Sequence, residues 1–118
     1  MTGVLLAAVL TLLLPGPRFN AYFTTGFTDA AYQQEAAAKV LKAWKPPKAA
    51  PVGKKTVLRA EISSDGKLAG LIDHQLTGNK PWDDAAIAAV RAAVPFKPLP
   101  KSWPHPTLEV DFHFEATK

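Results

Sequence analysis

The stretch that decides the fold is TGNKPWDDAAIAAVRAAVPFKPLP, which runs from Thr77 to Pro100. Its first residues, rich in Gly, Asn and Pro, predict a turn, and Asp83 follows where a carboxylate can cap the first N–H groups of a helix. Alanine and aliphatic residues then recur at three- and four-residue spacing, which predicts a helix with a shallow buried face that lies close to a sheet. Pro95 ends this helix because proline lacks the N–H that a helix interior needs.

A second helix is predicted upstream, ending at Trp44. Thr28 or Asp29 can cap its start, and Pro46 and Pro47 stop it soon after its last turn. Apolar side chains recur along it at the spacing that places them on one face. The residues of this apolar stripe are Tyr32, Ala36, Val40, Leu41 and Trp44.

Three segments alternate apolar and polar residues, as half-buried strands do. Thr56 to Ser63 and Lys67 to Asp73 flank the dipeptide Asp65-Gly66, which favours the positive φ angles of a tight hairpin. The last segment, Thr107 to Phe114, places apolar residues on one face and charged residues on the other. The sequence therefore predicts a hairpin followed, after the Ala-rich helix, by a third strand.

The order helix, strand, strand, helix, strand predicts an α+β fold. We expect a two-layer sandwich in which two helices cover one face of a three-stranded antiparallel sheet. At 118 residues the chain suits one small core. We assign residues 22–118 to this domain and residues 1–21 to a segment that resembles a signal peptide or a short membrane-targeting segment.

The N-terminal segment predicts export. Val4 to Leu14 is an apolar run of eleven residues, which is too short to cross a bilayer as a helix and is typical of the apolar region of a secretory signal. The clearest candidate cleavage point follows Ala21. We expect a periplasmic or envelope location, with an anchor in the inner membrane if the segment is not cleaved.

An aromatic cluster follows the apolar run and overlaps the expected cleavage point. Its members are Phe19, Tyr22, Phe23 and Phe27. One interpretation is contact with a membrane surface or a partner. The other is that these residues fold back over an open edge of the small domain or remain poorly ordered.

The sequence that contains these helices and strands resembles the C-terminal domain of TonB and of its relative TolA. The resemblance rests on the acidic helix start at Asp83 and Asp84, on the central pair Val90-Arg91, and on the Pro-Phe-x-Pro-x-Pro motif. As a pattern of spaced residues it extends from about Asp29 to Phe114. It implies a non-enzymatic protein-binding module of the bacterial envelope.

The resemblance also implies a mode of binding, in which an extended segment of the partner is added to an exposed sheet edge. It assigns that edge to the last strand, so the predicted partner-binding residues are Leu108, Glu109, Val110, Asp111, Phe112, His113 and Phe114. The expected partner is an envelope protein, such as an outer-membrane receptor or a Tol-system component. A structural domain that dimerises through the same edge is an alternative.

A second alternative comes from the polar side of the last strand. Glu109, Asp111, His113 and Glu115 project from one face because side chains on a strand alternate with a period of two. Such a row favours a small periplasmic metal-binding protein or enzyme only if another strand completes the ligand set. A solvated strand face is the simpler interpretation, so we expect no catalytic residue, no metal and no cofactor.

The composition sets further limits. The chain has no cysteine, which excludes a disulfide framework and thiolate metal ligands. Its formal charge is +4, with lysines concentrated between Lys39 and Lys55. No aromatic residues lie between these lysines after Trp44, so the pattern favours a solvated helix face and loop over a nucleic-acid-binding surface.

Overall fold

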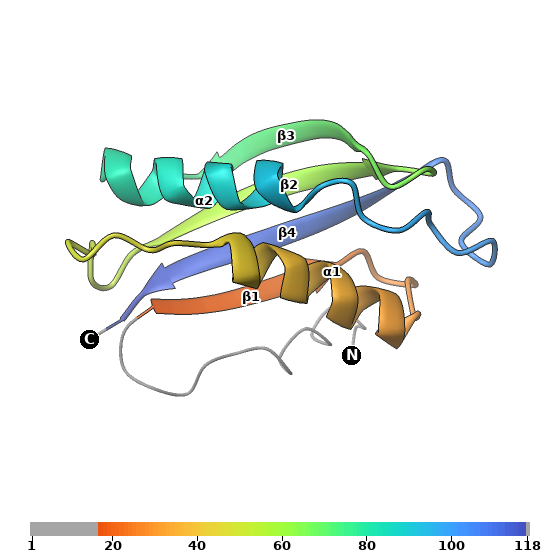
Figure 1. The fold of residues 1–118 in the computed structure, drawn as a ribbon, viewed down its shortest axis with the longest axis horizontal. Coiled ribbons are helices and arrows are strands. Elements are labelled where there is room, and N and C mark those ends of the chain that lie inside the picture. The colour runs from red at the N-terminus through yellow and green to blue at the C-terminus, as the bar shows by residue number, and fades with distance from the viewer. Residues whose placement is uncertain (1–16, 118) are drawn as a thin grey trace.

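The computed structural model describes residues 17–117, which form four strands and two helices (Figure 1). The elements in chain order are β1 (Pro17–Phe23), α1 (Ala30–Ala43), β2 (Lys55–Ser63), β3 (Leu68–Gln75), α2 (Lys80–Ala93) and β4 (Thr107–Ala116). The apolar run from Val4 to Leu14, which predicts export, lies outside the described residues. The expected cleavage point after Ala21 lies inside β1.

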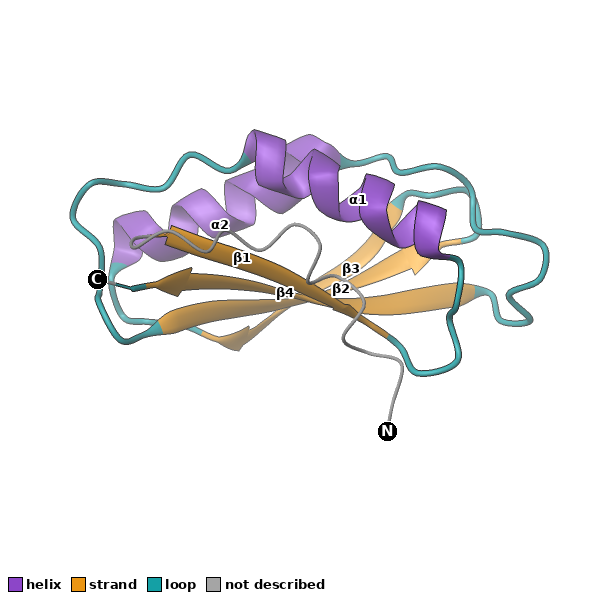
Figure 2. Ribbon diagram, turned by 90° about the horizontal axis from the view of Figure 1, so that it is seen from below, coloured by secondary structure: helices purple, strands orange, loops and turns teal. Residues whose placement is uncertain are grey.

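The four strands form one antiparallel sheet in the order β1, β4, β2, β3. Both helices cover the same face of this sheet, and none of the elements within residues 17–117 covers the opposite, open face (Figure 2). The prediction of an α+β fold with two helices and an antiparallel sheet is confirmed, but the prediction of three strands is wrong. The strand that the prediction lacked is β1, which lies beside β4 although more than eighty residues separate Phe23 from its partner Val110.

The two helix starts differ in how well they could be predicted. Of the two candidate caps of α1, Thr28 and Asp29, it is Asp29 whose side chain accepts a hydrogen bond from the N–H of Tyr32, at 2.9 Å. In α2 the cap is Asn79, which accepts from the N–H of Trp82 at 3.1 Å, and the prediction that Asp83 is the cap is wrong. The proline that follows in the first turn suits this earlier start because its missing N–H is not needed there.

Asp83 instead joins α2 to the sheet and to the preceding turn. Its buried carboxylate accepts hydrogen bonds from the hydroxyl groups of Thr56 at 2.6 Å and Thr77 at 2.9 Å. The backbone N–H groups of Thr77 and Gly78 also donate to it. Burial alone would raise the pKa of Asp83, but these hydrogen bonds outweigh it and lower the pKa below its usual value.

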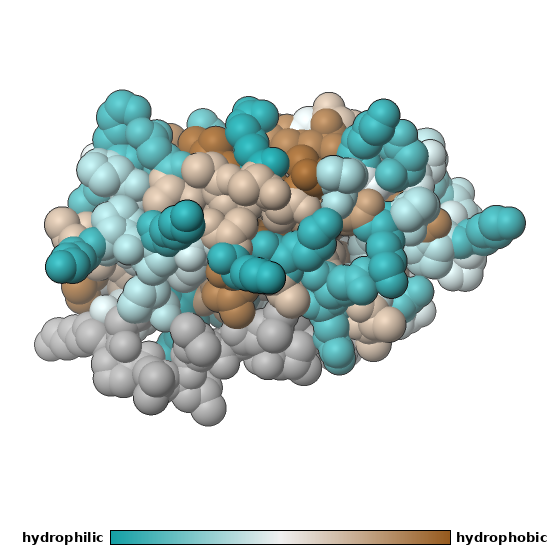
Figure 3. Space-filling view, in the orientation of Figure 1, coloured by the Kyte–Doolittle hydropathy of each residue, from teal (hydrophilic) through white to brown (hydrophobic). Residues whose placement is uncertain are grey.

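The core lies between the sheet and the helices. Trp44 ends α1 and is buried, with its ring edge-on to Trp82 at 5.4 Å and to Phe114 at 5.2 Å between ring centroids. Three elements therefore meet at one aromatic cluster, as the predicted apolar stripe of α1 requires. On the outer side of the helix layer, hydrophilic residues are spread over the surface and only small groups of strongly hydrophobic residues reach it (Figure 3).

The β2–β3 hairpin is held against the segment that follows α2. Gly66 has a φ angle of +87°, as the hairpin prediction requires, and its carbonyl oxygen accepts from the N–H of Phe96 at 2.9 Å. The N–H of Leu99 donates to the carbonyl oxygen of Ser64 at the same distance of 2.9 Å. A β-carbon on Gly66 would lie only 2.1 Å from the carbonyl oxygen of Phe96, so only glycine allows this approach.

Candidate functional site

The predicted partner-binding strand, Leu108 to Phe114, lies in the interior of the sheet. On one side β4 pairs with β2 from Thr107 to Glu115, and on the other it pairs with β1 from Val110 to Ala116. The expectation that this strand has an open edge is therefore wrong for this structure. The physical reason is β1, which occupies the side of β4 that the α-β-β-α-β order leaves unpaired.

The apolar face of β4 is closed by β1 as well as by the helices. Phe112 and Phe114 are fully buried, and Phe19 of β1 packs against both, with ring centroids 6.0 Å and 5.2 Å away. Leu108, Val110 and Ala116 complete the buried face of the strand. The predicted alternation of apolar and polar residues is confirmed, and its apolar half belongs to the core.

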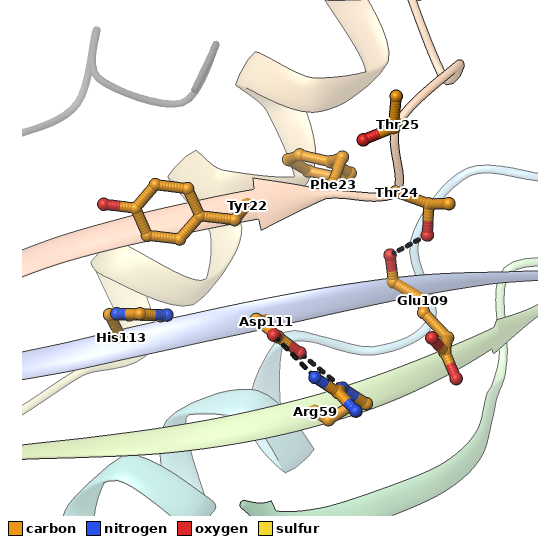
Figure 4. Close-up of a pocket in the computed structure, with 8 residues that line it drawn as sticks. All are labelled: Tyr22, Phe23, Thr24, Thr25, Arg59, Glu109, Asp111 and His113. Atoms are coloured by element: carbon orange, nitrogen blue, oxygen red, sulfur yellow. Dashed lines mark hydrogen bonds and ion pairs between the residues drawn. The ribbon is translucent and has the colours of Figure 1, made fainter. Parts of the chain in front are cut away.

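The polar side of β4 faces the open side of the sheet (Figure 4). Asp111 pairs with Arg59 of β2 through two hydrogen bonds, from Nε at 2.8 Å and from Nη2 at 3.1 Å. His113 contacts the ring of Tyr22 edge-on, with 4.5 Å between centroids. These side chains, together with Glu109, line a shallow hollow of about 420 Å³.

The surroundings of His113 keep its ring neutral. Burial lowers the pKa of His113 from its usual 6.5 to about 4, and the positive charge of Lys55 acts in the same direction, as does His74. The negative charge of Asp111 acts in the opposite direction and raises the pKa of His113, although Asp111 is itself ion-paired with Arg59. His113 therefore serves as a neutral aromatic contact for β1 at neutral pH.

The carboxylate and histidine row does not form a metal site in the part of the chain that the structure describes. No group of three or more His, Cys, Asp or Glu side chains within residues 17–117 could hold a metal ion. Asp111 is bonded to Arg59, and His113 is in contact with Tyr22. The row forms the solvated and partly covered face of a central strand.

Sequence reasoning did not single out the two real edges of the sheet, β1 and β3. The signal for β1 was present in the alternation of Phe19, Ala21 and Phe23, all of which are buried. Of the two interpretations of the aromatic cluster, folding back over an open edge is the one that the structure supports. On the other edge, Ile72 of β3 is 60% exposed and Leu76 just after it is 48% exposed.

The fold and the site define a small α+β domain in which one sheet face is covered by helices and an N-terminal strand closes one edge. The family model for the TonB C-terminal domain matches residues 29–114, and the chain belongs to that family. The resemblance inferred from the sequence is thereby confirmed. Neither the comparison with curated proteins nor the comparison with solved structures found a match.

Membership of the family supports a role in the cell envelope and in binding other proteins, because its domains are periplasmic, non-enzymatic modules that act on envelope proteins. The matched range begins at Asp29 and therefore does not include β1. In the described range, neither helix has the length and apolar character needed to cross a membrane.

Proposed function

We propose that this domain is a non-enzymatic protein-binding module of the bacterial envelope that holds an extended segment of its partner along β4. The contact strand is Leu108 to Phe114, and the incoming segment takes the place of β1. The partner is an envelope protein, such as an outer-membrane receptor or a Tol-system component. The observation that supports this proposal is β1 itself, an added strand that pairs with β4 over seven consecutive residues.

The position of β1 makes such an exchange geometrically simple. β1 is an edge strand whose ladder is formed with β4 alone, so its departure breaks no other strand pair. The ladder is extended at its end by Thr24, whose N–H and hydroxyl group both donate to the carbonyl oxygen of Glu109. Because β1 is tethered to the domain, the partner competes with a high effective concentration and binds only as tightly as that competition allows.

A reversible disulfide tests the exchange. Arg18 and Glu115 are directly opposite each other in the β1–β4 ladder, at the Cα separation that a disulfide can bridge. The chain has no cysteine of its own, so the only disulfide that the double variant Arg18→Cys/Glu115→Cys can form within one chain is the intended one, and the monomer is isolated after oxidation. The two single variants control for the substitutions.

The assay is capture of solubilised envelope proteins by the immobilised full chain, with and without reductant. We expect the oxidised double variant to lose a partner that both single variants retain, and reduction to restore it. Equal capture by the oxidised and reduced forms would refute binding along β4. It would direct attention to β3, where Ile72 and Leu76 are exposed.

A further inference from the structure

β1 occupies a space of defined shape beside β4, which we call the slot. The side chains of Phe19, Ala21 and Phe23 point into the core and are 0%, 0% and 2% exposed. Phe19 is enclosed by two aromatic rings of β4, and Phe23 stacks on Phe27 with 5.9 Å between centroids. The slot therefore accepts a large, a small and a large side chain at alternate positions of one strand.

The middle position of the slot requires a small residue. Ala21 lies opposite Phe112 in the ladder, and both residues are fully buried. The helix above, α1, packs on β1 and turns its buried alanines, Ala36 and Ala37, towards the core. A larger side chain at the middle position would have to displace these buried neighbours, and such overpacking is destabilising.

The two outer positions require bulk. When β1 leaves, the rings of Phe112 and Phe114 lose the contact with Phe19, and the space that held two phenylalanines is left empty. An incoming segment that makes only backbone hydrogen bonds would leave this cavity, and an unfilled cavity of that size is costly. Side chains that refill both outer positions are therefore necessary for a segment to compete with tethered β1.

The opposite side of the slot is permissive. Arg18 and Tyr22 lie on the open sheet face and are only partly buried. Tyr22 adds one contact to the slot, on the ring of His113. Residues of a partner segment that occupy these positions meet solvent and polar side chains, so their identity is less restricted.

We propose that the segment recognised by this domain carries two bulky apolar residues, aromatic for best fit, four positions apart with a small residue midway, and that it lies antiparallel to β4. This inference rests on the proposed function, because it specifies the chemistry of the segment that replaces β1. It assigns the partner to proteins that expose an extended, aromatic-small-aromatic sequence rather than any flexible segment with free backbone groups.

The probe is a fluorescein-labelled peptide with the sequence of β1, Pro17 to Phe23, followed by two lysines for solubility. Residues of the peptide are numbered as in the full chain. Binding is measured by anisotropy to the full chain with Phe19→Ala, which weakens the tethered strand and lets the peptide compete. If that chain does not fold, Tyr22→Ala serves instead, because its side chain lies outside the core. The variant Arg18→Cys/Glu115→Cys, in its reduced and its oxidised form, reports whether the peptide occupies the slot.

We expect alanine at either outer position of the peptide to weaken binding by about 100-fold. Leucine at the middle position should weaken binding by roughly tenfold. The matched control, Arg18→Lys in the peptide, keeps the charge of a partly buried residue on the open face and should alter binding by less than about threefold. A scrambled peptide of the same composition should not bind.

The outcomes separate this inference from the proposed function. If peptides with alanine at both outer positions bind as tightly as the parent, and the oxidised disulfide abolishes that binding, β4 accepts a strand without side-chain selection. The proposed function then stands and the inference is wrong. If the parent peptide fails to bind to either weakened chain at about 1 mM, the inference is also overturned. Binding that the oxidised disulfide does not affect would refute both.

Discussion

Gly66 is the position at which one added carbon should do the most damage for its size. In Gly66→Ala the new β-carbon would lie 2.1 Å from the carbonyl oxygen of Phe96 and 2.8 Å from that of Lys97. Both obstacles are backbone atoms, so no side-chain rotation can relieve them. The hairpin must move away from the segment that follows α2.

The magnitude follows from two contributions. A side chain at the φ angle of +87° costs about 1 kcal/mol in backbone strain. Separation of the hairpin from that segment removes the hydrogen bonds from Phe96 to Gly66 and from Leu99 to Ser64, each worth about 1 kcal/mol. We therefore expect Gly66→Ala to lower the free energy of unfolding by roughly 3 kcal/mol, a large share of the stability of a small domain.

Gly53→Ala is the matched control. Gly53 has a nearly identical φ angle of +85°, but a β-carbon there meets no atom within 4 Å. It should therefore cost only the strain of about 1 kcal/mol. Urea unfolding of both variants, with the m-value compared to detect a change in cooperativity, measures the difference. Equal losses in the two variants would show that the approach of Gly66 to Phe96 does not contribute to stability.

Other substitutions test the core and the titrating groups. Trp44→Ala should lower the free energy of unfolding by roughly 3 to 5 kcal/mol in denaturant melts, and an unchanged midpoint would contradict its burial. The pKa of His113 is lowered from 6.5 to about 4 on folding, so the unfolded chain takes up a proton first and stability falls as pH drops from 6.5 to 4. His113→Gln should flatten that part of the stability profile. Folding lowers the pKa of Asp83, so its carboxylate stabilises the fold at pH values above its pKa in the unfolded chain, and this stabilisation is lost as the pH falls through its pKa in the folded chain. Asp83→Asn should abolish this pH dependence and should lower the free energy of unfolding by about 1.5 to 3 kcal/mol at neutral pH.

The elements that local patterns specify were predictable from sequence. The cap at Thr28 or Asp29, the end of α1 at Trp44 and the glycine turn at Gly66 each depend on residues close in the chain, and the structure has a cap at Asp29 and both of the other features. The start of α2 was missed by a few residues, because Asn79 and Asp83 can both cap a helix. In the structure Asp83 instead accepts hydrogen bonds from Thr77 and Gly78 of the preceding turn and from Thr56 of a distant strand.

The candidate site was harder to predict because its exposure is a property of the whole sheet. The alternation along β4 identifies a half-buried strand but not whether its edges are paired. The part of β1 up to Ala21 was assigned to the end of an export segment, although Phe19, Ala21 and Phe23 show the same alternation as β4. A pattern of three buried residues is too short to reveal its partner strand, and the pairing joins the two ends of the domain.

Export and folding make opposite demands on β1. Cleavage after Ala21 would remove Phe19 and Ala21 and leave Phe112 and Phe114 without the cover that Phe19 provides, so β4 would have the open edge that the family resemblance implies. Retention of β1 buries Phe19 completely, and burial of such a ring stabilises a fold by about 1.5 to 3 kcal/mol.

We expect the stable form in the envelope to retain β1, because the aromatic side chains that it buries have no other place in the core. Intact-mass measurement of the protein purified from the envelope fraction tests this directly. A mass that corresponds to a chain beginning at or before Pro17 supports a domain that covers its own binding strand until a partner displaces β1. A mass that corresponds to a chain beginning at Tyr22 would contradict the expectation that β1 is retained. Binding along β4 would then be independent of any exchange. In that case peptide affinity would be set by the slot alone, without competition from a tethered strand.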